Sequence, residues 1–370
     1  MSEIIHLLGK SLNQFLDAFA QLNLPSHYAY LAYKYIYKHR ILHFERFPSF
    51  PTHIKTKLAN SASILPFKNY KSFLSKDGSR KYLFQLQDLS LIEAVWLPHY
   101  RKPTICISSQ LGCPVKCSFC STAYLPSIKN LSTQEILAQV LSILADTSPP
   151  ASPIPPTNIV FMGMGEPLLN YHNVYSAIRC LVLDFNFPQR NITLSTAGFV
   201  PNIYRLASEH IIPNLAVSLS APNDTLRNSL IPINRKFPIH SLLNACRNFP
   251  TQPVCFEYVL IHNINDSPLL AHQLASLLAN LNAKVNLIPF NPSPLLPPTL
   301  LPPTLPRLLR FQNILSSYNI PTFIRKNQGN DIFAACGNLA LLYPHTSLPI
   351  INPTCHHHIP HYPTPTPTTP

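Results

Sequence analysis

Residues 104–120 read Thr-Ile-Cys-Ile-Ser-Ser-Gln-Leu-Gly-Cys-Pro-Val-Lys-Cys-Ser-Phe-Cys, so a short apolar run leads directly into three cysteines. Cys113, Cys117 and Cys120 have the spacing Cys-x3-Cys-x2-Cys. These thiolates are too close along the chain to form disulfides with one another, but they can bind one face of an iron–sulfur cluster. A four-iron cluster takes four ligands, which would leave one iron open to a substrate or cofactor.

Two other interpretations of these cysteines stay open at this point. One is a zinc site completed by a fourth ligand, and the other is a group of unrelated thiols. Zinc sites usually come as two Cys pairs or as Cys and His pairs, and no second pair lies nearby in the sequence.

Strand-like and helical stretches alternate around this motif. Strands are predicted at 104–109, 158–162, 191–196, 214–220, 254–260, 284–290 and 320–325, and helices between them include 132–146, 172–184 and 268–281. Alternation of this kind indicates an α/β fold with a parallel sheet, open or closed into a barrel. Functional groups of such sheets gather at the carboxyl ends of the strands, which is where the cysteines fall.

The chain upstream of the motif divides into two predicted parts. Residues 1–62 have apolar positions at helical spacing, with a second helix after Pro25 that Ser26 could cap. Residues 63–98 contain a predicted β-hairpin with strands at 81–86 and 91–97 and a turn at Asp77-Gly78. Basic residues mixed with tyrosines in the first part suit RNA binding, although a small bundle with tyrosines in its core is an equal alternative.

Composition restricts the class of protein. The 370 residues carry a net charge of +13 at 12% charged residues, which indicates a polyanionic partner such as nucleic acid. No apolar run reaches the roughly 18 residues of a membrane span, and the N-terminus lacks a signal-peptide cleavage site, so a cytoplasmic protein is expected. Residues 346–370 are rich in Pro and Thr and are predicted to be disordered; they include Cys355 and His356–His358, a weak candidate for a metal site.

A second motif follows the predicted strand 158–162. It reads Phe161-Met-Gly-Met-Gly-Glu-Pro-Leu-Leu-Asn170, in a chain that has only eight glycines. Gly163 and Gly165 would let the backbone approach a ligand closely, and Glu166 could accept a hydrogen bond from an ammonium group. An ordinary glycine turn is the alternative.

The two motifs together resemble the radical S-adenosylmethionine (SAM) enzymes, and Phe119 fits the aromatic residue usual before their third cysteine. The resemblance implies a partial (βα)6 TIM-like barrel over residues 99–345, with the helical part as a small accessory domain and the hairpin as a linker. It also implies one [4Fe–4S] cluster on Cys113, Cys117 and Cys120, whose open iron binds SAM.

Over residues 1–345 the chain resembles one family more closely, the dual-specificity adenine C2 methyltransferases of 23S rRNA and tRNA. The segments that carry the resemblance are Leu91-Ile-Glu-Ala-Val-Trp-Leu-Pro98, Cys106–Cys113, Gly163–Asn170, Thr193-Leu-Ser-Thr-Ala-Gly198, Ser218-Leu-Ser-Ala-Pro-Asn-Asp224, Pro289-Phe-Asn-Pro292 and Gly329-Asn-Asp-Ile-Phe-Ala-Ala-Cys-Gly337. The residues implied to contact SAM are Gly165, Glu166, Ser195, Ser218, Leu219, Ser220 and Asn291. The family usually has His where this chain has Ser220, so the imidazole ring is missing at this position, while the hydroxyl can still donate and accept a hydrogen bond.

The resemblance also implies a catalytic role for three residues. Cys336 would be methylated by one SAM and would give up a hydrogen atom from that methyl group after a second SAM is cleaved. The resulting carbon radical would attack adenine C2, Glu93 would remove a proton from the adduct, and Cys106 would release the RNA by forming a transient disulfide with Cys336. Cys180, Cys246 and Cys255 are expected to be ordinary buried residues.

Expected partners are 23S rRNA and tRNA, with the target adenine unstacked, and an electron donor such as a flavodoxin or ferredoxin. The protein is expected to be a monomer. One alternative is a C8-directed adenosine methyltransferase, which shares the cluster and both mechanistic cysteines. Another is an RNA-binding protein with a structural zinc site, which explains neither Glu166 nor Cys336.

Overall fold

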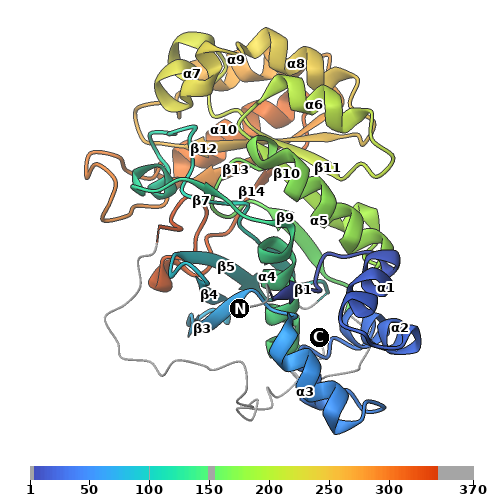
Figure 1. Cartoon of the computed structure of the whole chain (residues 1–370). Coiled ribbons are helices and arrows are strands. Elements are labelled where there is room, and N and C mark those ends of the chain that lie inside the picture. The colour runs from blue at the N-terminus through green and yellow to red at the C-terminus, as the bar shows by residue number, and fades with distance from the viewer. Residues whose placement is uncertain (1–3, 100, 149–154, 341–370) are drawn as a thin grey trace, which may run out of the picture.

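The protein is described by a computed structural model that covers residues 4–99, 101–148 and 155–340 (Figure 1). The predicted tail at 346–370, with Cys355 and His356–His358, lies outside these described residues. Within them, no helix is long and apolar enough to span a bilayer.

One ten-stranded sheet organises the described chain, in the order β14-β13-β12-β11-β10-β9-β6-β5-β4-β3. Its parallel strands are β6 (Thr104–Cys106), β9 (Asn158–Phe161), β10 (Ile192–Thr196), β11 (Asn214–Ser218), β12 (Val254–Leu260), β13 (Ala283–Pro289) and β14 (Thr322–Ile324). They are connected by α4 (Thr133–Thr147), α5 (Tyr171–Leu183), α6 (Val200–Ala207), α7 (Asp224–Leu230), α8 (Ile239–Arg247), α9 (Pro268–Leu278) and α10 (Leu305–Ser317). The predicted α/β fold of six strand–helix units is confirmed, and β14 corresponds to the seventh predicted strand, at 320–325.

The register of the parallel strands aligns their carboxyl ends. Ser195 on β10 pairs with Ala216 on β11, and Ser218 at the end of β11 pairs with Glu257 on β12. Polar side chains that are far apart in the sequence therefore lie at one edge of the sheet. A small two-stranded sheet, β7 (Gln110–Leu111) with β8 (Lys129–Asn130), brackets the cysteine segment between β6 and α4.

An antiparallel extension continues the sheet beyond β6. It consists of β3 (Phe67–Leu74), β4 (Arg80–Leu86) and β5 (Leu91–Leu97), and β5 pairs with β6 so that Val95 lies opposite Cys106. The predicted hairpin is therefore one part of a three-stranded meander, and the Asp77-Gly78 turn joins β3 to β4. Strand β3 was not predicted, because it is an edge strand in which only Phe67 and Phe73 are buried.

The N-terminal segment is helical, as predicted, but its first helix starts later than the apolar spacing indicated. It contains α1 (Leu12–Gln21), α2 (Ser26–Tyr37) and α3 (Thr52–Ser61), with a 3₁₀ turn η1 (Phe44–Arg46) and a parallel pair of short strands, β1 (Ile5–His6) and β2 (Ala62–Ser63). Ser11 caps α1 reciprocally with Gln14, which fixes the helix start at Leu12. The prediction that Ser26 caps α2 is wrong: Pro25 occupies the cap position and Ser26 is the first helical residue.

Helix α2 packs against the end of α5 (Figure 1). The Tyr37 ring meets Phe185 edge to face at 4.8 Å, and the Tyr33 hydroxyl donates a hydrogen bond to Asp184. Tyr35 and Tyr37 are buried, whereas Tyr30 is 52% exposed. The tyrosines of α2 thus serve mainly as core residues, and Tyr30 is free to contact a partner.

Candidate active site

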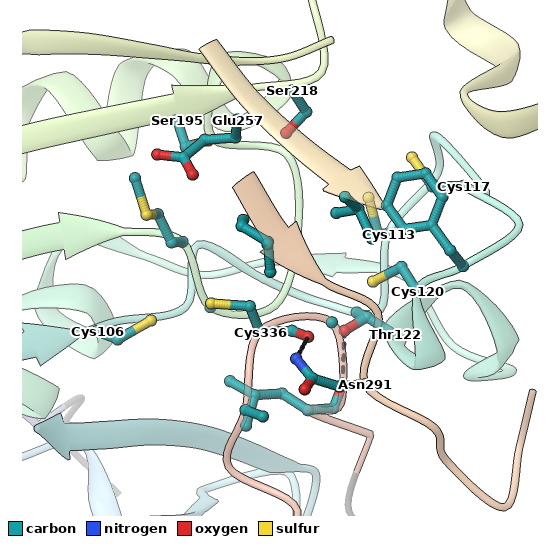
Figure 2. A pocket seen from close by; sticks show the side chains of 18 of the residues that line it. Cys106, Cys113, Cys117, Cys120, Thr122, Ser195, Ser218, Glu257, Asn291 and Cys336 are labelled. Atoms are coloured by element: carbon teal, nitrogen blue, oxygen red, sulfur yellow. Dashed lines mark hydrogen bonds between the residues drawn. The ribbon is translucent and has the colours of Figure 1, made fainter. Parts of the chain in front are cut away.

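A central pocket opens at the carboxyl ends of the parallel strands (Figure 2). Its wall includes Val95, Leu97, Cys106, Cys113, Cys117, Cys120, Thr122, Met162, Gly163, Gly165, Glu166, Ser195, Ser218, Glu257, Asn291, Arg325 and Cys336. Most of the residues predicted for the site therefore line one cavity, although they come from segments that extend from Cys106 to Cys336.

Cys113, Cys117 and Cys120 lie together on one side of this pocket (Figure 2). Their loop is held by two backbone bonds, from Ser118 N to Leu230 O at 3.0 Å and from Cys120 N to Cys117 O at 3.2 Å. Burial raises the pKa of all three thiols, that of Cys113 to about 12. Ligand binding by these thiols must therefore release protons.

Three thiols on one short loop are the donor set that a [4Fe–4S] cluster takes from a protein when its fourth iron is left open. The donor set and its place on the pocket wall are what a cluster with one open iron requires.

The loop after β9 places Glu166 in the pocket, where its carboxylate is 3% exposed. Glu166 Oε1 accepts from Leu168 N at 3.0 Å and Oε2 accepts from Ala197 N at 2.6 Å. Burial raises the pKa of this carboxyl, although the two amides oppose the shift. The carboxylate is thus oriented by the backbone and keeps lone pairs for a ligand.

The two glycines before Glu166 are required for a reason that the sequence did not reveal. A Cβ on Gly163 would lie 2.6 Å from Ser108 Oγ, and one on Gly165 would lie 2.5 Å from Gln110 Cβ. Gly165 also has a φ of +98°, which disfavours any other residue. The close approach is therefore to residues 107–110 after β6, and it holds both predicted motifs against each other.

The remaining predicted cofactor contacts divide into two groups. Ser195, Ser218 and Asn291 line the pocket, whereas Leu219 and Ser220 are fully buried and are not part of its wall. Ser220 adopts a φ of +52°, and its hydroxyl accepts a hydrogen bond from Val259 N at 3.2 Å. At this position the side chain supports the loop after β11.

The two predicted mechanistic cysteines face each other. Cys106 on β6 and Cys336 on the loop after β14 point their sulfurs toward one another across the pocket (Figure 2). Cys336 is exposed and Cys106 is buried, and burial raises the Cys106 pKa to about 12. The Cys336 carbonyl accepts a hydrogen bond from Asn291 Nδ2 at 3.1 Å, which fixes the backbone at this position. As expected, Cys180, Cys246 and Cys255 are buried.

Glu93 lies on β5, two residues before pocket-lining Val95, and its side chain is fully buried. Its carboxylate forms an ion pair with Lys81 on β4, at 3.0 Å, and neither side chain is exposed. Because alternate residues of a strand share a face, Glu93, Val95 and Leu97 all belong to the side of β5 that faces the pocket. Glu93 is not itself part of the pocket wall.

Three charged residues of the site had not been predicted. Glu257 and Arg325 line the pocket, and Arg227 is fully buried beneath it. Glu257 Oε2 and Asn291 Oδ1 are buried without a hydrogen-bond partner among the described residues, so the wall offers unused acceptors to a polar ligand. The scarcity of charge in this chain was the one signal that could have singled out Glu257 within its apolar strand.

Known proteins resemble this chain in sequence and in fold. Residues 107–273 match the model of the radical SAM superfamily. The chain is similar to the dual-specificity RNA methyltransferase RlmN of Syntrophobacter fumaroxidans, at 46% identity with 72% of this chain and 78% of that protein covered. It is also similar to the probable dual-specificity RNA methyltransferase RlmN of Koribacter versatilis, at 39% identity with 86% of this chain and 97% of that protein covered. Among solved structures, a radical SAM methyltransferase from Sphaerobacter thermophilus matches with a TM-score of 0.84 and 37% identity, covering 90% of this chain and 99% of that one.

Proposed function

Because the chain belongs to the dual-specificity RNA methyltransferases RlmN of the radical SAM superfamily, we propose that it methylates adenine C2 in 23S rRNA and tRNA with Cys336 as the methyl carrier. The observation that carries this proposal is that Cys336 and Cys106 face each other in the pocket that also holds the three-cysteine loop. An RNA-binding protein with a structural zinc site has no use for that pair.

Three groups of residues hold the cofactors in this proposal. Cys113, Cys117 and Cys120 bind the cluster, and Glu166 accepts from the ammonium group of SAM. The unused acceptors Glu257 Oε2 and Asn291 Oδ1 bind its remaining polar groups. When bound, the cluster and two SAM molecules per turnover supply one electron, one methyl group and the abstraction of one hydrogen atom from that methyl group.

The protein's own side chains perform the remaining steps. Cys336 accepts the methyl group on sulfur, and the same carbon becomes bonded to adenine C2. Glu93 accepts the proton from C2, and one electron must leave the adduct in the same step, so that the electron supplied at the start is recovered and the adduct becomes closed-shell. Cys106 thiolate then attacks Cys336 Sγ, so that the S–S bond forms as the S–C bond breaks; the carbon keeps the bonding pair and takes up a proton to become the methyl product. An external thiol or reductase must reduce the disulfide before the next cycle.

RNA reaches the pocket with its target base unstacked, because C2 is not accessible inside a base-paired helix. We assign RNA binding mainly to residues 1–71, which hold nine of the 28 Lys and Arg residues but only three acidic ones. A flavodoxin or ferredoxin supplies the electron, and the enzyme works as a monomer in the cytoplasm.

Trapping the covalent adduct tests this mechanism directly. Anaerobically prepared Cys106→Ala enzyme should accumulate a protein–RNA adduct, because nothing attacks Cys336 Sγ once the carbon–carbon bond has formed. Cys336→Ala should form no adduct and no methylated adenosine, and Cys180→Ala, which alters a buried cysteine outside the pocket, should turn over normally. Denaturing gel electrophoresis measures the adduct.

Two results would contradict the proposal. Normal turnover of Cys106→Ala would remove its resolving role. Mass spectrometry of nucleosides from the RNA product that found only 8-methyladenosine would assign the enzyme to C8. Metal analysis of the purified protein adds a separate check, because zinc without iron would exclude the cluster.

A further inference from the structure

The turn between β3 and β4 contacts the segment that leads to Cys336. Asp77 Oδ2 accepts a hydrogen bond from Gly329 N at 2.8 Å. In the opposite direction, Asp331 accepts from Ser75 Oγ at 2.5 Å and from Lys76 N at 3.1 Å. Each segment thus supplies one aspartate that binds the other segment.

Both partners of this contact are locally rigid. In the turn, Asp77 Oδ1 accepts from Ser79 N at 2.9 Å, and Ser75 N donates to Ser79 O at 2.8 Å. In the other segment, Gly329 has a φ of +68° and its carbonyl accepts from Ala334 N at 2.8 Å. The hydrogen bonds of Asp77 to Gly329 and of Asp331 to Ser75 and Lys76 form a clamp between the two segments. This clamp joins two preformed turns, which limits the conformational entropy lost when it forms.

The clamp is the main polar attachment of the segment before Cys336. Within the described chain, every hydrogen bond from residues 326–335 to another element ends on the turn 75–79. Beyond Cys336 the support is different: Gly337 O accepts from Ser121 N, beside the cysteine loop, at 2.7 Å. One side of the carrier is thus held by the cluster loop and the other by the β3–β4 turn.

The ionised state of both aspartates suits this contact. Partial burial opposes ionisation of Asp77, but the amides of Ser79 and Gly329 outweigh it and hold its pKa below the usual value. For Asp331 the Ser75 hydroxyl is the main cause of a lowered pKa. Each carboxylate is therefore a full acceptor at neutral pH, with donors on both of its oxygens.

We propose that Asp77 and Asp331 are positioning residues that set where Cys336 stands relative to Cys106. The proposal rests on the function assigned above to these two cysteines. Because Ser79 directly precedes β4, the clamp also ties the methyl carrier to the strand pair that holds Lys81 and Glu93. Cys336, Glu93 and Cys106 are thereby all attached to the same meander: Cys336 through the β3–β4 turn, Glu93 as part of β5, and Cys106 through the pairing of β6 with β5.

Thiol–disulfide exchange measures this positioning without any need for methyl transfer. The anaerobic holoenzyme is equilibrated with reduced and oxidised glutathione, and mass spectrometry after alkylation quantifies the Cys106–Cys336 disulfide. The ratio of disulfide to dithiol protein at a known glutathione poise gives the effective concentration of the Cys106 thiol at Cys336. We expect it to fall by about tenfold or more in Asp77→Asn and in Asp331→Ala, because the carrier loop samples more positions.

The substitutions differ in a way that the hydrogen bonds dictate. Both oxygens of Asp77 accept from N–H donors, so an Asn there must point its NH₂ at one of them. Asp331→Asn should be milder than Asp331→Ala, because its NH₂ can donate to the Ser75 hydroxyl. Asp88→Asn is the control: Asp88 accepts from Ser90 N in the β4–β5 turn at 3.1 Å and does not touch the carrier segment.

A second readout is the number of SAM molecules cleaved per methylated adenosine. This number should rise in the clamp variants, because SAM is then cleaved more often without methyl transfer when Cys336 is displaced. It should stay at the wild-type value in Asp88→Asn. If a variant fails to show a cooperative thermal transition, Ser75→Ala replaces it, since it removes a single bond to Asp331.

The outcomes separate the two proposals. If the wild type forms the disulfide and both clamp variants give the same effective concentration, the positioning role of Asp77 and Asp331 is wrong. The roles assigned to Cys106 and Cys336 would still stand. Failure of the wild-type enzyme to form the disulfide at all would overturn the assigned roles of the cysteines and, with them, the clamp.

Discussion

Individual residues of the pocket show how burial and charge prepare thiol chemistry. Cys106 is buried, and burial raises its pKa to about 12, so very little thiolate exists at neutral pH. The positive charge of Arg325, which lines the same pocket, acts in the opposite direction and lowers that pKa. Cys336 opposes it, because a second thiolate nearby raises the pKa further.

Removing the Arg325 charge should therefore slow resolution of the adduct. Arg325→Met raises the pKa of Cys106, and the thiolate is the attacking species. Below the pKa the thiolate fraction, and with it the rate of adduct release, should rise about tenfold per pH unit in the wild type. In the variant the same rate should be reached only at higher pH.

Rapid-quench measurement of adduct decay against pH checks this expectation. A profile of Arg325→Met that coincides with the wild-type profile would contradict the electrostatic role. Arg325→Lys retains the charge and should lie between the two. Below the pKa, a higher pKa and a structural defect both lower the rate by the same factor at every pH, so recovery of the rate in Arg325→Lys is what identifies the lost charge as the cause.

At the level of secondary-structure elements, Arg227 joins the ends of two strands. From α7 its Nη2 donates to Ala197 O at 2.7 Å and to Ser218 O at 2.9 Å, and its Nε donates to Leu219 O at 3.2 Å. These carbonyls follow β10 and β11, where Ser195 and Ser218 enter the pocket. A buried guanidinium thus joins two loops that line the pocket, and burial lowers its pKa only to about 10, so it stays charged.

Arg227→Lys should weaken SAM binding although Arg227 does not line the pocket. A lysine has three donors on one atom and cannot match the fork that spans three carbonyls. Each buried carbonyl left without a donor costs about 1–3 kcal/mol, so we expect Kd for SAM to rise about tenfold or more. Equilibrium dialysis measures it, with Arg205→Lys on the surface of α6 as the control. An unchanged Kd would show that the loops hold their spacing without Arg227.

In the molecule as a whole, the N-terminal helices depend on one buried tyrosine. The Tyr37 hydroxyl accepts from Gly9 N and donates to Lys10 O, both at 2.9 Å, while its ring packs on Phe185 after α5. The residue thus joins the start of the chain, helix α2 and the barrel. It thereby connects the segment proposed to bind RNA to the end of α5.

Tyr37→Phe should loosen the N-terminal helices without disturbing the pocket. The substitution removes two part-buried hydrogen bonds, at a cost of about 0.5–1.5 kcal/mol each. Hydrogen exchange of residues 4–62 should accelerate by about tenfold or more, whereas the pocket strands keep their protection. Tyr30→Phe, at the exposed position of α2, is the matched control. Equal acceleration in the barrel would mean that Tyr37 stabilises the whole protein instead.

Much of this molecule could be predicted from local patterns. The parallel strands, the three-cysteine loop and the Glu166 loop follow from periodicity and spacing, because backbone hydrogen bonding and burial act over a few neighbouring residues. The start of α1 was misplaced because the capping pair Ser11 and Gln14 overrides the apolar spacing of the residues before it. Strand β3 was not predicted, because an edge strand buries too few side chains to show a clear alternation of apolar and polar residues.

The sequence by itself therefore determined the fold class, the family and many of the residues that line the pocket, but not Glu257 or Arg325. The resemblance also implied that Cys106 and Cys336 meet. Only the tertiary structure decided the contacts of Glu93 with Lys81 and of Gly329 with Asp77. The physical reason is that the first set depends on local geometry, which repeats along the chain. The second set depends on how distant segments close upon one another, and that is fixed by packing of the whole sheet and the helices around it.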